Sequence, residues 1–246
     1  LTGKIALVTG GSRGLGREMV RAYAEAGADV VIASRKLPQC EELAEEIRER
    51  FGRRALPYSC NVGDWEQVEG MVEAAYDHFG RLDVLVNNAG ITRDRMFLKM
   101  TLEDWNAVIS TNLTSMFNVT KQVVADMVEQ GFGRIIQISS VNGQKGQAVQ
   151  TNYSAAKAGM HGFTMALAQE MATKGVTVNT VSPGYIGTEM VRAIRPDVLE
   201  KIVGTVPVKR LGEPSEIASI VSWLASQESG YSTGADFSVN GGLHIG

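Results

Sequence analysis

The chain has 246 residues, of which 44% are hydrophobic and 21% are charged, and these values are typical of one or at most two globular domains. With 24 basic and 27 acidic residues the formal net charge is −3, so no overall positive field would attract nucleic acid or an anionic membrane. No run approaches the roughly 18 apolar residues that a membrane span needs, and we expect an unexported, cytoplasmic chain. Two cysteines and three scattered histidines rule out a disulfide framework and offer no spacing for a metal site.

Short apolar runs alternate with longer amphipathic stretches along the chain, a pattern typical of βαβ units around a buried parallel sheet. We predict seven strands, each apolar enough to be covered on both faces: Ile5–Thr9, Val30–Ser34, Ala55–Cys60, Val84–Asn87, Arg134–Ser139, Val176–Val181 and Asp236–Val239. Helical patterns lie at 14–26, 39–51, 64–79, 101–130, 151–174 and 214–227. The predicted fold class is therefore α/β, a Rossmann-type, doubly wound parallel sheet with helices on both faces.

No linker, repeat or low-complexity segment interrupts this alternation, so we predict one domain over residues 1–246. Within it, residues 1–90 form the expected cofactor-binding half, and residues 91–246 form the catalytic and substrate half. The longest insert without a strand, residues 184–212, follows the sixth predicted strand and contains two prolines. Long inserts of this kind often cover binding sites, and we expect a flap over the substrate.

A glycine-rich turn links the first predicted strand to the first helix, with the pattern T-G-x-x-x-G-x-G over residues 9–16. Glycines allow a sharp turn and a close approach to a ligand, and the helix N-terminus that follows attracts a pyrophosphate. A tight turn without a ligand would also use glycine, but the position between strand and helix favours a dinucleotide site. The residues expected to contact the cofactor here are Gly10, Ser12, Arg13, Gly14, Leu15 and Gly16.

The second predicted strand ends in Ser34-Arg35-Lys36, with no acidic residue where one would bind the ribose hydroxyls of a cofactor without a 2′-phosphate. Arg35, helped by Arg13, is placed to pair with a 2′-phosphate through charge-assisted hydrogen bonds. This pattern predicts NADP(H), although a solvated basic pair would look the same. The third and fourth strands end at the same edge of the sheet, which adds the candidate cofactor residues Asn61, Val62, Asn88, Ala89 and Gly90.

Tyr153 and Lys157 are four residues apart in a predicted helix, so both lie on one helix face. An ammonium group beside a phenol lowers the phenol pKa, which makes the tyrosine a usable acid and base near neutral pH. Ser140 follows the fifth predicted strand and completes a candidate catalytic group. Asn112 falls inside the long predicted helix 101–130, where asparagine is unfavourable. Either a buried hydrogen bond or a water molecule held beside Lys157 would explain its position.

Together these residues resemble the short-chain dehydrogenase/reductase family: the glycine pattern, the Asn-Asn-Ala-Gly sequence at 87–90, Asn112, Ser140, Tyr153 with Lys157, and Pro183-Gly184. From about Gly90 onward the amino-acid sequence is similar to the sequences of the NADPH-dependent acetoacetyl-CoA reductases of polyhydroxyalkanoate synthesis. Residues 1–89 resemble short-chain reductases in general. Because the two parts differ in this way and the first residue is not methionine, we expect a recombinant or engineered chain.

The resemblance implies that Tyr153 protonates a ketone that receives hydride, while Ser140 donates a hydrogen bond to the same oxygen. Lys157 would lower the tyrosine pKa and hold the nicotinamide ribose, and Asn112 would hold a water molecule that resupplies the proton. The residues implied to border the nicotinamide are Pro183, Gly184, Ile186 and Thr188. Those implied to line the substrate pocket are Asp94, Ser140, Gln147, Gln150, Tyr153, Gly184 and Tyr185.

The implied substrate is a short 3-oxoacyl-CoA, with acetoacetyl-CoA first, because glutamine and tyrosine side chains suit the thioester and pantetheine amides. Basic residues in the flap give a local positive excess that suits CoA phosphates, though a solvated helix face would carry the same residues. The alternatives are a 3-oxoacyl carrier-protein reductase, a small-alcohol or sugar dehydrogenase, and a regulatory nucleotide-binding protein. The resemblance also implies a homotetramer paired through leftover apolar positions on helices 101–130 and 151–174.

Overall fold

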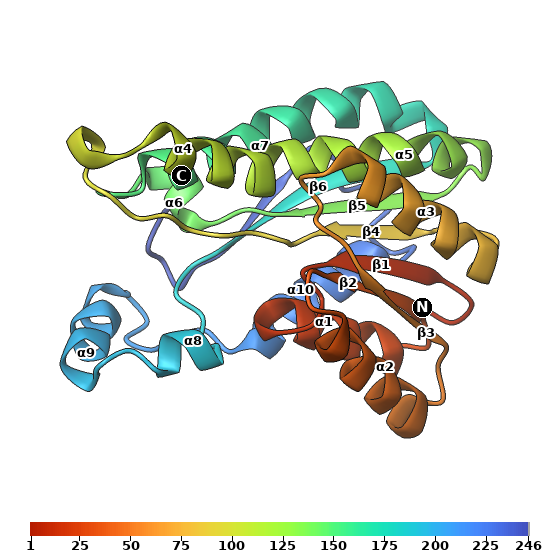
Figure 1. The fold of residues 1–246 in the computed structure, drawn as a ribbon, viewed down its shortest axis with the longest axis horizontal. Helices are drawn as coiled ribbons and strands as arrows, with labels where there is room; N and C mark the ends of the chain where they lie inside the picture. Colours follow the sequence, from red (N-terminus) through yellow and green to blue (C-terminus); the bar gives the residue numbers. More distant parts are fainter. Residues whose placement is uncertain (246) are drawn as a thin grey trace.

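Seven parallel strands form one sheet in the order β3-β2-β1-β4-β5-β6-β7 in a computed structural model that describes residues 1–245 (Figure 1). The strands are β1 (Ile5–Thr9), β2 (Asp29–Ser34), β3 (Ala55–Ser59), β4 (Val84–Asn87), β5 (Gly133–Ile138), β6 (Val176–Pro183) and β7 (Asp236–Val239). Gly246, the last residue of the predicted catalytic half, lies outside the described residues. The predicted α/β fold with a doubly wound parallel sheet is confirmed.

The helices of the described chain connect these strands. They are α1 (Gly14–Glu25), α2 (Leu37–Phe51), α3 (Trp65–Phe79), α4 (Leu102–Ile109), α5 (Ser115–Glu129), α6 (Val141–Lys145), α7 (Thr151–Met171), α8 (Glu189–Arg192), α9 (Pro196–Thr205) and α10 (Pro214–Ala225). None of them is both long and apolar enough to cross a membrane.

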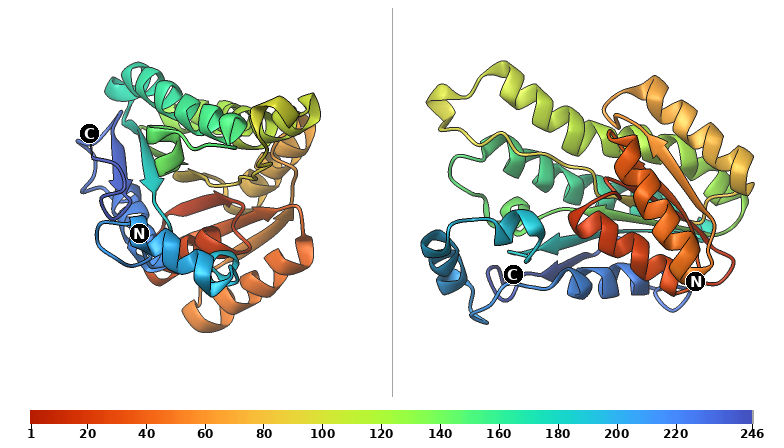
Figure 2. Two further views of the ribbon diagram at one scale, coloured as in Figure 1. Left: turned by 90° about the vertical axis from the view of Figure 1, so that its left-hand side faces the viewer. Right: turned by 60° about the horizontal axis from the view of Figure 1, so that its bottom comes forward.

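Both faces of the central strands are buried, because successive side chains of a strand point to opposite sides. In β1, Ala6 and Val8 pack in a core with α1, α2 and α10, while Ile5 and Leu7 pack in a second core with α3, α5 and α7. Figures 1 and 2 show these two groups of helices as layers on either side of the sheet. The apolar runs of the central strands therefore reflect burial on both faces.

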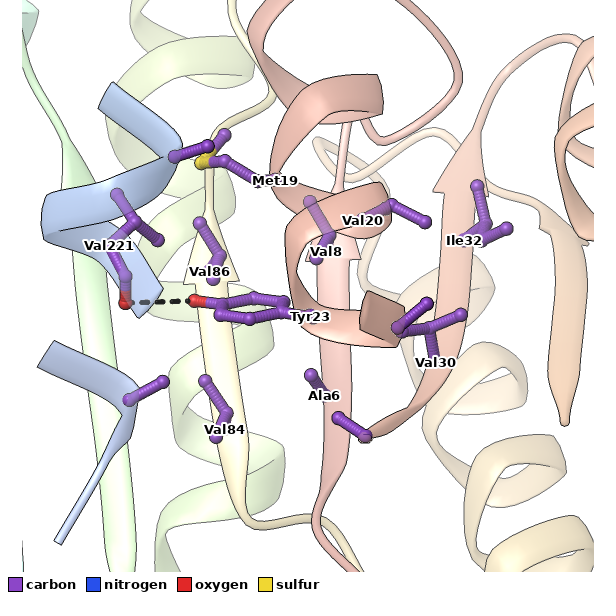
Figure 3. Packing of buried hydrophobic residues seen from close by; sticks show 14 of the residues in the cluster. Ala6, Val8, Met19, Val20, Tyr23, Val30, Ile32, Val84, Val86 and Val221 are labelled. Carbon is purple, nitrogen blue, oxygen red and sulfur yellow. Dashed lines mark hydrogen bonds between the residues drawn. The ribbon is translucent and has the colours of Figure 1, made fainter. Parts of the chain in front are cut away.

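Tyr23 of α1 joins two helices of the first layer (Figure 3). Its side chain is fully buried, and its hydroxyl donates a 3.3 Å hydrogen bond to the main-chain carbonyl of Val221 in α10. Burial raises the pKa of this phenol well above its ordinary value. The hydrogen bond matters because a buried hydroxyl without a partner would be unfavourable.

The prediction that every strand is covered on both faces is wrong for the two edge strands. In β7, Asp236 and Ser238 are exposed, and Phe237 and Val239 are only partly buried. β3 is also largely half-buried. Each of these strands has a neighbour on one side only, so fewer elements cover its faces.

The predicted continuous helix over 101–130 is also wrong. It is divided into α4 and α5 by a π-helical turn, Ser110–Thr114, which contains Asn112. Such turns are rare in proteins, and those that occur are often found at functional sites. The same stretch begins with a capping box, in which the Thr101 hydroxyl accepts from Asp104 N–H and the Asp104 carboxylate accepts from Thr101 N–H.

The strand order reverses between β1 and β4, which pair directly with each other. At such a point the loops after neighbouring strands run in opposite directions and leave a crevice at the carboxyl ends of the strands. The predicted flap, residues 184–212, contains α8 and α9, and in Figure 1 both helices lie beyond this end of the sheet.

Candidate functional site

A cavity of about 850 Å³ lies at the carboxyl ends of β1 to β4. Its walls contain every cofactor residue predicted up to Gly90, together with Thr188 of the flap. They also contain residues that the sequence analysis did not assign: Ser34, Lys36, Gln39, Cys60, Ile91, Thr111 and Glu189. Among these, Ser34, Lys36 and Cys60 adjoin predicted positions, whereas Thr111 and Glu189 come from a helix and the flap and follow no strand end. The volume suits a large organic ligand.

The glycine turn leaves space and free N–H groups at one wall of this cavity. Gly10 and Gly14 have positive φ angles of 64° and 53°, and a side chain on Gly16 would lie 2.2 Å from the Gly10 carbonyl oxygen. Arg13 precedes α1, but no side chain caps the first N–H groups of this helix. Unpaired N–H groups and the positive end of the helix dipole suit an anion such as a pyrophosphate.

Asn88 supports the glycine turn from the neighbouring strand. Its Nδ2 donates to the carbonyls of Thr9 at 2.9 Å and Gly10 at 3.1 Å, and its main-chain N–H donates to the Thr9 hydroxyl at 3.0 Å. Asn88 was predicted to contact a cofactor directly. Asn88 does line the cavity, and its side chain also holds the turn in shape.

Two arginines lie at the end of the cavity formed by β2. Arg13 and Arg35 are exposed and both line the cavity, and neither forms an ion pair within the described part of the chain. Between them the Ser12 hydroxyl donates to the Ser34 hydroxyl at 2.9 Å. Asp29, at the opposite end of β2, is paired with Arg53 and Arg54 at 2.9 and 2.8 Å. The cations are therefore available to an anionic ligand.

The predicted catalytic residues come from two adjoining elements. Ser140 follows β5, and its hydroxyl accepts a 3.1 Å hydrogen bond from Asn142 N–H at the start of α6. Tyr153 and Lys157 share one face of α7, with Lys157 Nζ 5.6 Å from the centre of the Tyr153 ring. The Ser140 side chain lies near enough to Tyr153 to lower the pKa of its phenol. The structure thus brings together Ser140, Tyr153 and Lys157, the three residues that the sequence analysis predicted to act together.

Lys157 is buried, and its Nζ donates a 2.6 Å hydrogen bond to the main-chain carbonyl of Ile138. Burial lowers the pKa of this amine from 10.5 to about 7, because a charge is poorly solvated there. Burial raises the pKa of Tyr153; the Ser140 side chain opposes this rise, and the negative charge of Asp94 adds to it. The expected lowering of the phenol pKa is therefore not seen here. Lys157 is half neutral near pH 7, so it supplies less positive charge than expected.

Asn112 is buried, and its side chain pairs with both main-chain groups of Ile91. Its Oδ1 accepts from Ile91 N–H at 2.8 Å, and its Nδ2 donates to the Ile91 carbonyl at 2.9 Å. A side chain on Gly90 would lie 3.5 Å from Asn112 Oδ1 and 3.7 Å from Lys157 Nζ. The buried hydrogen bonds that we considered are present, and Gly90 brings the cavity wall close to Lys157.

Three of the residues expected at the nicotinamide, Pro183, Gly184 and Ile186, lie outside the cavity wall. Pro183 ends β6 and is buried. Gly184 lies so close to Asn240 that a Cβ atom on Gly184 would be 2.7 Å from the Cα of Asn240. Ile186 packs in the core beside α1 and α10. Its side chain fills the core, so its predicted contact with a cofactor stays a prediction.

The predicted substrate residues are linked in part. Gln150 Oε1 accepts from Asn142 at 2.9 Å, and Gln150 Nε2 donates to Asp94 Oδ2, also at 2.9 Å. Gln147 accepts from Lys145 at 3.3 Å. The segment 142–150, which contains Gln147 and Gln150, begins with most of helix α6. Tyr185 is half-buried, and its main-chain carbonyl accepts from Gly212 N–H at 2.9 Å.

The expected positive excess of the flap is cancelled by two glutamates that follow it. Its basic side chains form three ion pairs: Arg192 with Glu213 at 2.9 Å, Arg195 with Asp197 at 3.1 Å and Arg210 with Glu216 at 2.7 Å. These groups are largely exposed, so each pair contributes little to stability. Three of the five basic side chains of the flap are therefore paired, whereas Lys201 and Lys209 take part in none of these ion pairs.

Comparison with known proteins agrees with this arrangement. The chain is 60% identical over 246 residues to the acetoacetyl-CoA reductase of Cupriavidus necator, with both chains fully covered. It is 51% identical over 245 residues to the acetoacetyl-CoA reductase of Allochromatium vinosum, covering 98% of this chain and 99% of that one. It is also 45% identical over 243 residues to the 3-oxoacyl-(acyl-carrier-protein) reductase of Escherichia coli, covering 99% and 98%. The short chain dehydrogenase family matches residues 4–199, and the chain belongs to this family.

Proposed function

We propose that this protein is an NADPH-dependent reductase that converts acetoacetyl-CoA to (R)-3-hydroxybutyryl-CoA. Membership of the short-chain dehydrogenase family implies a nicotinamide cofactor. The observation that carries the proposal is the grouping of Ser140, Tyr153 and Lys157, of which Lys157 lies next to Gly90 of the cavity wall. Full-length similarity to acetoacetyl-CoA reductases supports the choice of substrate. We expect a cytoplasmic homotetramer.

The residues present fit the cofactor. The glycine turn and the free N–H groups at the start of α1 would hold its pyrophosphate, because no side chain caps these groups and both Gly14 and Gly16 line the cavity. Arg13 and Arg35 would hold the 2′-phosphate, while Asn61 and Val62 would border the adenine at the end of β3. When bound, NADPH supplies hydride to the ketone carbon.

The chemistry of this chain concerns the ketone oxygen. Tyr153 donates its hydroxyl proton to that oxygen, and Ser140 donates a hydrogen bond to it. Lys157 lies beside the Tyr153 ring and makes the phenolate easier to form when its amine is protonated. Asn112 keeps the segment after β4 in place through Ile91, and we propose that it also holds the water that resupplies the proton.

We propose that acetoacetyl-CoA lies over Asp94, Gln147, Gln150, Gly184 and Tyr185. Gln150 spans Asn142 and Asp94, which joins the segment after β4 to the segment before α7. Amide and hydroxyl groups on these segments suit the thioester and pantetheine amide, which need polar partners when they are buried.

A carrier-protein reductase is the second candidate, because the relative from Escherichia coli covers nearly the whole chain. The deciding experiment compares acetoacetyl-CoA, acetoacetyl carrier protein and free acetoacetate, each with NADPH, by nicotinamide absorbance. Acetoacetyl-CoA should have the highest kcat/KM, and free acetoacetate should be poor because it lacks the remote groups that position the ketone. A carrier-protein substrate that is better by about tenfold, which is 1.4 kcal/mol, would establish the second candidate instead.

The assay is repeated with Tyr153→Phe, which removes the proposed acid and keeps the ring. Its turnover should fall by orders of magnitude while NADPH binding changes little. Tyr231→Phe serves as the matched control, because Tyr231 is fully exposed. A Tyr153→Phe enzyme with nearly normal turnover would show that another group protonates the ketone.

A further inference from the structure

A second polar cluster lies behind the catalytic residues, centred on His161. This residue follows Lys157 by one turn of α7, and its ring contacts residues of three neighbouring strands or their ends. Its Nε2 lies 2.9 Å from the hydroxyl of Ser139 after β5, 3.4 Å from the hydroxyl of Ser182 in β6, and 3.6 Å from Oδ2 of Asp236 in β7. The proposed function uses none of these four side chains.

The hydrogen bonds around His161 determine where its proton lies. The Ser139 hydroxyl donates its one hydrogen to the main-chain carbonyl of Lys157 at 2.9 Å, so it can only accept from His161. The Ser182 hydroxyl donates to Asp236 Oδ1 at 2.7 Å, so it too can only accept. A carboxylate also accepts only. Nε2 of His161 is therefore surrounded by acceptors and must carry a hydrogen.

Asp236 is itself fixed by a helix on the other side. Gln144 of α6 donates from Nε2 to Asp236 Oδ2 at 2.7 Å and to the Ser238 hydroxyl at 2.6 Å. The cluster thus joins α6, α7 and three strands, and a carboxylate held in this way favours the Nε2–H form of His161.

The cluster acts on Lys157 through its main chain. The carbonyl of a helix residue normally accepts from the N–H four residues later, so the bond from Ser139 is an additional one. Lys157 is consequently held at two points by consecutive residues at the end of β5: its Nζ by the Ile138 carbonyl at 2.6 Å and its own carbonyl by Ser139 at 2.9 Å. The next residue is Ser140, which places both contacts beside the reacting groups.

We propose that His161 is a positioning residue: its Nε2–H group holds the Ser139 hydroxyl, and Ser139 holds Lys157 in register with Ser140. This inference rests on the proposed reductase chemistry and adds to it a residue that touches neither substrate nor cofactor. Without the donor on His161, the Ser139 hydroxyl is free to rotate away from the Lys157 carbonyl. Small displacements of catalytic groups lower turnover strongly.

The test compares two variants of His161 in the full-length protein. His161→Leu removes the donor and keeps an apolar side chain on α7, and we expect kcat for acetoacetyl-CoA to fall about tenfold with KM changed less than about twofold. His161→Gln carries an N–H donor at a similar reach and should stay within about twofold of the parent kcat. A merely structural role would give no such rescue.

Thr164→Val is the matched control. Thr164 joins the same helix and strand through a 2.8 Å hydrogen bond with Thr180, one turn further along α7, and it does not touch Ser139. This variant should lose some thermal stability and keep its kcat. If Thr164→Val lowers kcat as much as His161→Leu, the effect of His161 is general loosening of α7 and the proposal is wrong.

A double-mutant cycle tests the route through Ser139. Ser139→Ala should lower kcat to a similar extent as His161→Leu, and the double variant should be no worse than either one, because both break the same connection. Effects that multiply in the double variant would overturn the proposal. A Ser139→Ala variant with the kcat of the parent would also overturn the proposal. This variant alone tests the proposal if His161→Leu does not fold. A parent chain without reductase activity would instead refute the proposed function.

Discussion

The Nζ atom of Lys157 donates a 2.6 Å hydrogen bond to the main-chain carbonyl of Ile138, and the lysine side chain is buried. A carbonyl oxygen accepts from the neutral amine as well as from the ammonium ion, so it offsets only part of what burial does to the charged form. As a result, the pKa of Lys157 falls to about 7. The amine therefore titrates in the range where the enzyme is expected to act.

The first prediction concerns stability against pH. The folded chain binds a proton at Lys157 only below about pH 7, whereas the unfolded chain binds it up to the ordinary value of 10.5. Between these values the unfolded state binds more protons, so this group makes the folded state more stable as the pH rises. Urea unfolding of the parent and of Lys157→Met, measured at pH 7, 8 and 9, should show the difference between them moving in favour of the parent. A difference that does not change with pH would mean that Lys157 keeps its charge when folded.

The second prediction concerns cofactor preference. Arg35 is exposed at the cavity, outside any ion pair of residues 1–245. A hydrogen bond to a charged group contributes about 1.5–3 kcal/mol, so NADPH should exceed NADH in kcat/KM by at least about tenfold. Arg35→Asp removes this contact and repels the phosphate, and it should abolish or reverse the preference. Lys174→Asp, which makes the same charge change at an exposed turn, should leave it unaltered. If Arg35→Asp still prefers NADPH as strongly as the parent, the phosphate is bound elsewhere.

The third prediction concerns the substrate segment. Removal of the Gln150 amide breaks two hydrogen bonds, to Asn142 and to Asp94, and Tyr185→Ala removes a half-buried ring at the start of the flap. Both Gln150→Ala and Tyr185→Ala should raise KM for acetoacetyl-CoA several-fold, on the order of 1 kcal/mol of binding. Gln169→Ala, on an exposed part of α7, is the control. Unchanged acetoacetyl-CoA kinetics in both variants would exclude these residues from the substrate site.

The bounds of several strands were predicted correctly from the sequence, whereas features that depend on contacts between distant residues were not. Ile5–Thr9, Val84–Asn87 and Asp236–Val239 have the predicted bounds, because apolar runs and the turns beside them are local signals. The π-helical turn at Asn112 was not predictable in this way, since the Asn112 side chain is paired with Ile91, which is 21 positions away.

The grouping of Ser140, Tyr153 and Lys157 was predictable because tyrosine and lysine four residues apart share a helix face and Ser140 follows a predicted strand. The residues that pack behind this group and hold it in place were not predictable from the sequence. Helix α6 contains Gly143, where a side chain would lie only 2.8 Å from the main-chain carbon of Lys157, so this glycine permits close packing that no propensity indicates. The His161 cluster draws on positions 139, 182 and 236, and only the folded sheet brings these together.

The last prediction concerns Val149, which lies between two proposed substrate residues and has a φ angle of +65°. This left-handed conformation is unfavourable for a β-branched residue and costs about 1–3 kcal/mol. The main-chain carbonyl of Val149 accepts a 2.8 Å hydrogen bond from Arg95 N–H, which holds the segment against the strain. Val149→Gly should keep this bond, because glycine adopts positive φ freely. Relief of the backbone strain stabilises the folded state, and the greater conformational entropy of glycine in the unfolded chain offsets part of this gain. The net result should be a rise of about 1 kcal/mol in the free energy of unfolding.

Val149→Ala separates the contribution of the branched side chain from that of the backbone. Alanine removes the branching but keeps a Cβ atom, so it should be less stable than Val149→Gly and at least as stable as the parent. Lys209, the other non-glycine residue with positive φ in the described chain, at +57°, provides the comparison: Lys209→Gly should gain less, since lysine is not β-branched. Urea unfolding of the four proteins measures this order. A Val149→Gly variant less stable than Val149→Ala would show that the segment, and not residue 149, sets the backbone conformation.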